Sequence, residues 1–364
     1  MNITMYENPK LKITNTDFEP TTIGWRSPSN LAIVKYWGKF GIQEPRNPSI
    51  SLTLKNAYTD TTLTYAPKAK LSSEIELEFF FENKKQPAFK AKIVKFLKNI
   101  QPIFPFLNQL QFTIYSSNSF PHSAGIASSA SSMSALALCL CSIERELFGT
   151  LQNDADFYKK VSYISRLGSG SASRSMYPVA AMWGELDGFS EASNLYAIPF
   201  EDKVHEVFKG YHDTILIASR GEKSVSSTAG HQLMEGNIYA ESRYEQARNR
   251  CRDLADILKA GDVTAFGELA EDEALTLHAL MMCSKPSYML MRPNSMAMIE
   301  KVRNYRAETK QPLYFSLDAG PNLHLLYPDA IQPQVMDFIK SDLVPLCQDG
   351  EFIEDRVGNG ASRI

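Results

Sequence analysis

The chain has 364 residues, 44% of them hydrophobic and 22% charged, which are ordinary values for a globular protein with one large or two smaller domains. Its 38 Lys and Arg nearly balance its 41 Asp and Glu, and the net charge of −3 excludes a global field that would attract nucleic acid or an anionic membrane surface. Any anion-binding site must therefore be local.

The five cysteines include no CxxC pair and lie in no histidine-rich neighbourhood, which indicates a reduced, cytoplasmic chain without structural zinc. Residues 1–17 lack the basic and apolar pattern of a signal peptide, and no window approaches the roughly 18 consecutive apolar residues of a membrane span. We therefore expect neither secretion nor a transmembrane segment.

The first half of the chain is predicted to contain both strands and helices. Strands are expected at residues 31–36, 52–54, 61–65, 75–81 and 110–115. Residues 88–100 predict a Lys-rich amphipathic helix whose basic face is turned to solvent. Residues 125–148 predict a long helix that ends at Gly149.

The second half is predicted to be richer in helices. A strand is expected at 214–218, helices at 239–259, 263–282 and 295–306, and strands at 313–317 and 323–326. Strands with segregated helices favour an α+β fold with a division near residues 190–210. We therefore expect an N-terminal domain over residues 1–200 and a C-terminal domain over residues 201–364.

Residues 116–132 are mostly small and lie between a predicted strand and a predicted helix. Exposed amides, hydroxyl groups and the helix dipole would bind a polyphosphate there. The segment is not a Walker A loop, because the chain has no Gly-x4-Gly-Lys-Ser/Thr sequence. The alternative is a Ser/Ala-rich helix packed closely against a sheet. His122 is isolated in this loop and is interpreted as an ordinary polar residue.

A second small-residue segment, residues 168–173, leads directly into Arg174. It is not interpreted as a dinucleotide fingerprint, because residues 157–165 before it are predicted to be helical instead of extended. The segment favours a loop that wraps an anion and presents a bidentate guanidinium to it. A Gly/Ser turn with a surface arginine is the alternative.

Two further segments place charged side chains at the ends of predicted strands. Asp318 lies between a strand and a Gly-Pro turn, where it either points into a cleft or stabilises the turn. Residues 35–39, Lys-Tyr-Trp-Gly-Lys, combine two cations with two amphipathic aromatic rings. These side chains either hold a ligand or close a core.

Taken together, these segments resemble the signature segments of the mevalonate diphosphate decarboxylases of the GHMP kinase superfamily. Residues 27–39, 120–130, 168–175 and 318–322 carry the resemblance, which spans roughly residues 25–328. The resemblance implies two α+β lobes: an N-terminal lobe of ribosomal-S5-like topology and a C-terminal ferredoxin-like lobe, with the active site between them. It also implies a homodimer.

The resemblance implies a reaction that uses ATP and Mg²⁺. The tertiary 3-hydroxyl of mevalonate 5-diphosphate would be phosphorylated, and phosphate and CO₂ would then leave to give isopentenyl diphosphate. Asp318 would orient and deprotonate the hydroxyl, Arg174 would clamp the substrate carboxylate, and Lys35 would offset developing charge. The sequence names no magnesium ligand.

The resemblance also implies which residues bind the two reactants. The expected substrate contacts are Tyr36, Trp37, Gly38, Lys39, Ser169, Gly170, Ser171, Ala172, Ser173, Ser227 and Thr228. The expected contacts with the ATP phosphates are Ser123, Ala124, Gly125, Ile126, Ala127, Ser128 and Ser129.

The chain departs from the family pattern at three places. Residues 121–125 read Pro-His-Ser-Ala-Gly where Pro-Thr-Ala-Ala-Gly is common, residues 177–181 replace a glycine-rich stretch, and His231 stands where a methionine is usual. A sibling enzyme that decarboxylates or only phosphorylates mevalonate or its 5-phosphate is therefore an alternative. A non-catalytic nucleotide-binding relative is another, but the presence of both Asp318 and Arg174 argues against it.

Overall fold

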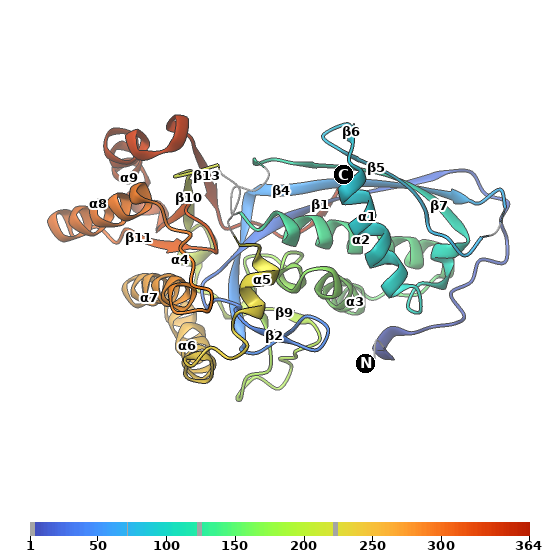
Figure 1. The fold of residues 1–364 in the computed structure, drawn as a ribbon, viewed down its shortest axis with the longest axis horizontal. Coiled ribbons are helices and arrows are strands. Elements are labelled where there is room, and N and C mark those ends of the chain that lie inside the picture. Colours follow the sequence, from blue (N-terminus) through green and yellow to red (C-terminus); the bar gives the residue numbers. More distant parts are fainter. Residues whose placement is uncertain (1–3, 71, 122–125, 221–224) are drawn as a thin grey trace.

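The structure, a computed structural model, describes residues 4–70, 72–121, 126–220 and 225–364. The elements form two lobes that lie side by side, the first at the right of Figure 1 and the second at its left. Each lobe has its own sheet, and helices pack against both sheets. This arrangement confirms the α+β prediction.

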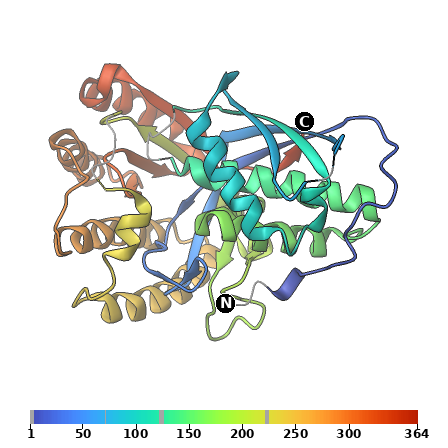
Figure 2. The same cartoon turned by 45° about the vertical axis from the view of Figure 1, so that its right-hand side comes forward.

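The first lobe is built on an eight-stranded sheet. Its main path runs in the order β14 (Ser362–Arg363), β1 (Thr21–Ala32), β4 (Ser49–Pro67), β7 (Leu110–Asn118), β5 (Glu76–Phe81) and β6 (Lys84–Lys85). Strand β8 (Ala180–Trp183) pairs with β4, and β9 (Ala197–Pro199) pairs with β8. Helices α1 (Pro87–Ile100), α2 (Ser128–Phe148) and α3 (Asp154–Gly168) share a core with this sheet (Figure 2).

The second lobe is built on a four-stranded antiparallel sheet, in the order β11 (Tyr314–Leu317), β12 (Leu323–Tyr327), β10 (His212–Leu216) and β13 (Phe352–Arg356). Helices α8 (Pro293–Thr309) and α9 (Gln332–Phe338) pack on one face of this sheet. Helices α6 (Ala240–Ala260) and α7 (Val263–Met282) pack on the other face, beside the first lobe. Three short elements lie near the junction: the hairpin of β2 (Lys39–Phe40) and β3 (Glu44–Pro45), α4 (Glu206–Lys209) and α5 (Ser227–Gln232).

Most predicted elements are confirmed, but the strand predicted over 31–36 is wrong over most of its length. The observed strand, β1, covers Thr21–Ala32, so only residues 31 and 32 of the prediction lie in it. The backbone amide of Ile33 still donates to the Ile50 carbonyl at 2.8 Å, but the amide of Lys35 donates to the Glu273 carboxylate at 2.9 Å. A side chain of the second lobe thus replaces the neighbouring strand as the acceptor, and the ladder stops.

One other prediction needs correction. The separate strands predicted at 52–54 and 61–65 belong to one long strand, β4. The Lys-rich helix forms as α1, and its lysines are exposed as predicted, although Lys92 also lines a cavity. The predicted start of the long helix at residue 125 lies outside the described residues, and the described helix begins at Ser128 and is followed by Gly149 with a positive φ of 63°.

The two lobes share apolar and polar contacts. Ile33 and Leu52 of the first lobe belong to the same buried cluster as Leu254 and Phe266 of the second lobe. Strand β14, near the chain's end, returns to pair with β1 of the first lobe. The predicted domain boundary at residue 200 therefore cannot apply to β14, which belongs to the sheet of the first lobe. For the rest of the chain the boundary stays a prediction.

Asp355 on β13 is the main polar tie to β4. Its buried carboxylate accepts hydrogen bonds from the backbone amides of Lys55, Asn56 and Ala57 at 2.9, 2.7 and 2.7 Å. These amides lie where the pairing of β4 with β1 shifts register, so the carboxylate supplies the acceptors that the neighbouring strand would otherwise provide.

Asp355→Ala should therefore destabilise the fold. Three backbone amides, that of Ala57 buried and those of Lys55 and Asn56 partly buried, would lose their acceptor, and we expect the free energy of unfolding to fall by about 3 kcal/mol. Chemical denaturation measures this change. The exposed neighbour Glu354→Ala is the matched control and should change it by less than about 0.5 kcal/mol. Equal effects of the two substitutions would contradict the assigned role.

Candidate active site

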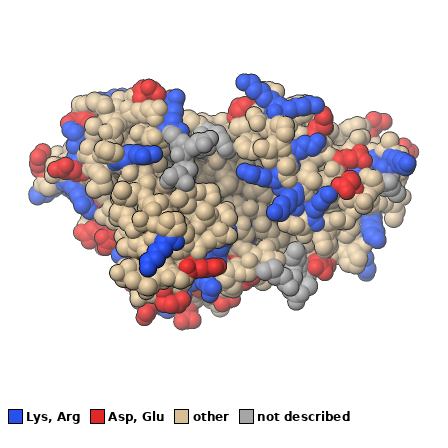
Figure 3. Space-filling view, viewed as in Figure 1, with Lys and Arg blue, Asp and Glu red and all other residues tan. Residues whose placement is uncertain are grey.

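A cavity of roughly 570 Å³ lies between the two lobes. Figure 3 shows the molecule hollowed at this place, with Lys and Arg side chains along the right-hand edge of the hollow. The wall is formed by residues 30–39, α1, the start of α2, residues 168–174, α5 and the turn at Asp318. Segments far apart in the sequence therefore meet around one space.

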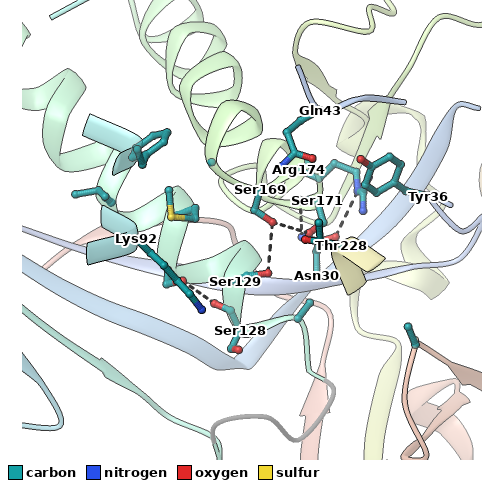
Figure 4. A pocket seen from close by; sticks show the side chains of 18 of the residues that line it. Asn30, Tyr36, Gln43, Lys92, Ser128, Ser129, Ser169, Ser171, Arg174 and Thr228 are labelled. Carbon is teal, nitrogen blue, oxygen red and sulfur yellow. Dashed lines mark hydrogen bonds between the residues drawn. The ribbon is translucent and has the colours of Figure 1, made fainter. Parts of the chain in front are cut away.

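The cavity has a polar end and an apolar end. Tyr36, Gln43 and Thr228 lie at one end, and Lys92 and Ser128 lie at the other (Figure 4). Apolar side chains of β5, β7, α1 and α2 also line it: Phe79, Phe81, Phe89, Ile93, Phe96, Ile114, Met133 and Leu136. This composition suits a ligand that has both anionic groups and a flat apolar part.

Lys35 and Asp318 form an ion pair across the two lobes. The Lys35 ammonium donates to Asp318 Oδ1 at 3.0 Å and to the Ser316 hydroxyl at 2.9 Å. The Lys35 side chain is 3% exposed and that of Asp318 is 23% exposed, so the carboxylate is accessible from the cavity whereas the ammonium is covered. The pair places a fixed carboxylate and a fixed cation at one point of the wall.

The backbone of Lys35 is held by a buried carboxylate of α7. Glu273 accepts the Lys35 amide at 2.9 Å and pairs with the guanidinium groups of Arg243 at 2.6 Å and Arg250 at 2.8 Å. Burial raises the pKa of the Glu273 carboxyl, but the two arginines outweigh this effect and hold the pKa below its usual range. Glu273 therefore stays ionised and fixes the segment that carries Lys35.

Another buried pair lies beside Ser316. His324 stands opposite Ser316 in the register of β11 and β12, and its Nδ1 atom lies 2.9 Å from the Asp213 carboxylate. Burial lowers the pKa of His324, but Asp213 outweighs burial and the pKa is raised overall. The pair adds a polar layer behind the Lys35 contact.

Arg174 is completely buried and has neutral partners. Its guanidinium donates to Ser49 at 2.7 Å, to Ser51 at 3.0 Å and to Asn30 at 3.3 Å. Burial lowers the pKa of Arg174 to about 10, while the Asp318 carboxylate opposes this change. Arg174 is therefore charged at neutral pH, and its charge is available to an anion in the cavity that it lines.

Tyr36 presents an unused hydrogen-bonding group. Its hydroxyl is buried and has no hydrogen-bond partner in the described part of the chain, although the residue lines the cavity. A Cβ atom on Gly170 would lie 2.8 Å from that hydroxyl, so only glycine allows the two to approach this closely. The ring rests against Trp183 with centroids 4.7 Å apart.

Three serine hydroxyls bridge the start of α2 and the turn after α3. Ser169 lies 3.4 Å from Ser129 and 3.5 Å from Ser171, measured between hydroxyl oxygens. Ala127, which precedes α2, has a φ of 45°, a left-handed conformation that turns the chain sharply into the helix. The first amides of the helix and these hydroxyls are donors of the kind that phosphate oxygens accept.

The structure brings most of the predicted site residues to this cavity. Its wall includes Lys35, Tyr36, Trp37, Lys39, Ala127, Ser128, Ser129, Ser169, Gly170, Ser171, Arg174, Thr228 and Asp318. Gly38, Ile126, Ala172 and Ser173 are not wall residues, and Ser173 instead donates to the Gly170 carbonyl at 2.8 Å. For Ser227 only the backbone is described, at the start of α5. Ser123, Ala124, Gly125 and His122 lie outside the described residues.

Several residues that line the cavity or position Lys35 were not predicted from the sequence. Asn30, Gln43, Lys92 and His231 line the cavity, and Glu273 and Ser316 position Lys35. Asn30 could have been found, because it belongs to the Ser-Pro-Ser-Asn segment that precedes Lys35. The partners on α7 and β11 carry no local sequence signal.

Two family descriptions match this chain. Residues 27–193 match the diphosphomevalonate decarboxylase-like N-terminal domain, and residues 214–361 match the mevalonate 5-diphosphate decarboxylase C-terminal domain. The chain belongs to the diphosphomevalonate decarboxylase family. The two matched domains meet at the cavity, and the family resemblance predicted from the motifs is confirmed.

Individual diphosphomevalonate decarboxylases are similar over most of the chain. The enzyme of Eremothecium gossypii is 27% identical over 318 residues, which cover 83% of this chain and 76% of the relative. That of Candida albicans is 28% identical over 323 residues, which cover 86% of both chains.

Solved structures of the diphosphomevalonate decarboxylase family have the same fold. The Staphylococcus aureus mevalonate diphosphate decarboxylase superposes with a TM-score of 0.81 at 25% identity and covers 96% of this chain and 100% of its own. A complex of MDDEF with MVAPP, AMPPCP and magnesium gives a TM-score of 0.78 at 25% identity, over 95% of this chain and 99% of its own. The two-lobed GHMP kinase fold expected from the sequence is confirmed.

Glu273→Gln tests whether the Glu273 carboxylate holds the backbone of Lys35 in place. The substitution keeps the shape but leaves the buried Arg243 without its carboxylate and the half-buried Arg250 with Asp272 alone. We expect the free energy of unfolding to fall by about 3 kcal/mol, with a lower kcat. The exposed neighbour Asp272→Asn is the control and should cost less than about 1 kcal/mol. The assigned role fails if denaturation finds the two costs equal.

Proposed function

We propose that the chain catalyses the ATP-dependent decarboxylation of mevalonate 5-diphosphate to isopentenyl diphosphate, with ADP, phosphate and CO₂ as the other products. The observation that carries this proposal is the meeting of the Lys35–Asp318 pair and Arg174 in one cavity of a chain of this family. A carboxylate for proton transfer and two cations are the groups that this chemistry needs.

The substrate occupies the polar end of the cavity. Arg174 binds its carboxylate, because this guanidinium is charged and has only neutral partners among the described side chains. The 5-diphosphate lies toward Lys39, whose ammonium donates to the Gln43 side chain at 3.0 Å. Burial lowers the pKa of Lys39, and an arriving anion favours its charged form.

ATP occupies the apolar end. Its adenine lies among the aromatic side chains of β5 and α1, and its phosphates lie over the first turn of α2, near Ser128, Ser129 and Lys92. The described residues hold no group of three or more His, Cys, Asp or Glu side chains arranged for a metal ion. The hydroxyls of Ser128 and Ser129 would fit Mg²⁺ that is held mainly by nucleotide phosphates, and the ion would neutralise phosphate charge there.

The first step is a phosphoryl transfer. The 3-hydroxyl of the substrate donates its proton to the Asp318 carboxylate while its oxygen attacks the γ-phosphorus, and ADP leaves. Lys35 stays beside Asp318 and offsets negative charge at the transferring group. Because both lobes contribute to this pair, the reacting atoms meet only when the lobes are correctly placed.

The second step removes two groups. The bond between the carboxylate carbon and its neighbour breaks, CO₂ leaves, and the electron pair forms the double bond as phosphate departs from the adjacent carbon. Arg174 holds the carboxylate in position until the bond breaks.

We also infer a cytoplasmic location. None of the helices within the described ranges is both long and apolar enough to cross a membrane, and all five cysteines are free, as in a reducing compartment. The homodimer and the domain limits at residues 1–200 and 201–364 stay predictions.

Asp318→Asn tests the proton-transfer role. The amide keeps the size of the side chain but cannot accept the proton, so kcat should fall about 10³-fold while calorimetry shows that ATP and substrate still bind. Arg174→Gln should also lower kcat, because the carboxylate loses its clamp. The exposed Asp329→Asn serves as the control and should leave kcat unchanged. An Asp318→Asn variant that kept most of its activity would refute the assignment.

A further inference from the structure

His231 is a wall residue for which the proposed reaction has so far no use. It lies on α5, three positions after Thr228, so both side chains are on one face of the helix and both line the cavity. The residue is only 9% exposed. It is clamped between the rings of Tyr36 and Trp37, with centroid distances of 4.4 and 4.7 Å. The direction of its nitrogen atoms is therefore fixed.

The tautomer of His231 follows from its contact with Gly38. The Gly38 amide donates to His231 Nδ1 at 2.9 Å, so this nitrogen carries a lone pair and no proton. Burial, with a further contribution from Lys39, lowers the pKa of His231 to about 3, and the ring is neutral at neutral pH. A neutral imidazole carries one N–H group, so the proton is on Nε2.

The Nε2–H group is therefore a donor without a protein acceptor. No described residue forms a hydrogen bond with it. Nε2 is also not one of the fully buried side-chain atoms that lack a partner, so it is exposed to the cavity that His231 lines. Lys39 is close enough to act on the ring electrostatically and has no carboxylate partner in the described ranges. A fixed donor beside an unneutralised cation is a site for an anionic oxygen.

We propose that His231 Nε2–H donates a hydrogen bond to a diphosphate oxygen of the substrate and thereby determines affinity for the 5-diphosphate. The proposal rests on the function proposed above and names a contact within that same site.

Two substitutions separate the two nitrogens of the ring. His231→Asn retains an acceptor near the position of Nδ1 but removes the distal donor. His231→Gln retains a distal N–H near the position of Nε2 but loses the proximal acceptor. Steady-state kinetics with mevalonate 5-diphosphate and Mg²⁺-ATP should show a KM for the diphosphate about tenfold higher in His231→Asn, with the KM for ATP unchanged. In His231→Gln most of this increase in KM should be absent. The control on the same helix is the exposed Gln232→Asn.

The opposite pattern would overturn the proposal. If His231→Gln were impaired and His231→Asn resembled the wild type, the ring would serve only to hold Gly38. If the KM for the diphosphate rose equally in both variants and both had lower melting temperatures, His231 would have only a packing role. If the KM rose in neither variant, His231 would make no contact with the diphosphate. Failure of the proposed function is separate, because the wild type would then release no ADP and CO₂. Calorimetry with inorganic pyrophosphate would still compare the two variants in that case.

Discussion

The ion pair between Lys35 and Asp318 joins the two lobes at the point where the proposed chemistry takes place. Lys35 follows β1 of the first lobe, whereas Asp318 follows β11 of the second lobe, and their charged atoms lie 3.0 Å apart. A buried ammonium without a partner costs several kcal/mol, so this contact favours one relative placement of the lobes. The cavity, the base and the neighbouring cation all depend on that placement.

The cations around the cavity differ in the partners that the protein gives them. Arg243 and Arg250 are matched by Glu273 and serve the structure. Arg174 donates to hydroxyl and amide oxygens, and Lys39 donates to an amide oxygen. These neutral partners leave the charge of both side chains without a counter-ion. A substrate with a carboxylate at one end and phosphates at the other supplies the missing charges. Function is thus concentrated where a buried cation, Arg174, and a half-buried one, Lys39, lack a carboxylate.

The sequence predicts the wall of the site better than its support. Residues 35–39, 168–174 and Asp318 could be found because small residues and charges cluster locally at the ends of predicted elements, and these segments do line the cavity. Glu273 and Ser316 could not be found, because they lie 238 and 281 positions from Lys35 in the sequence. The same long-range contact explains why the strand predicted over 31–36 ends early. From the sequence, His231 was noted only as a departure from the family pattern. The role proposed for it depends on the tautomer of the ring, which follows from the contact with Gly38.

The most direct test of the account measures ADP and CO₂ together. Purified protein is supplied with Mg²⁺-ATP and mevalonate 5-diphosphate, and both products are counted against the substrate consumed. We expect one ADP and one CO₂ for each diphosphate molecule. ADP without CO₂ would contradict decarboxylation and indicate a 3-kinase, and turnover of only the 5-phosphate or of mevalonate would contradict the assigned substrate.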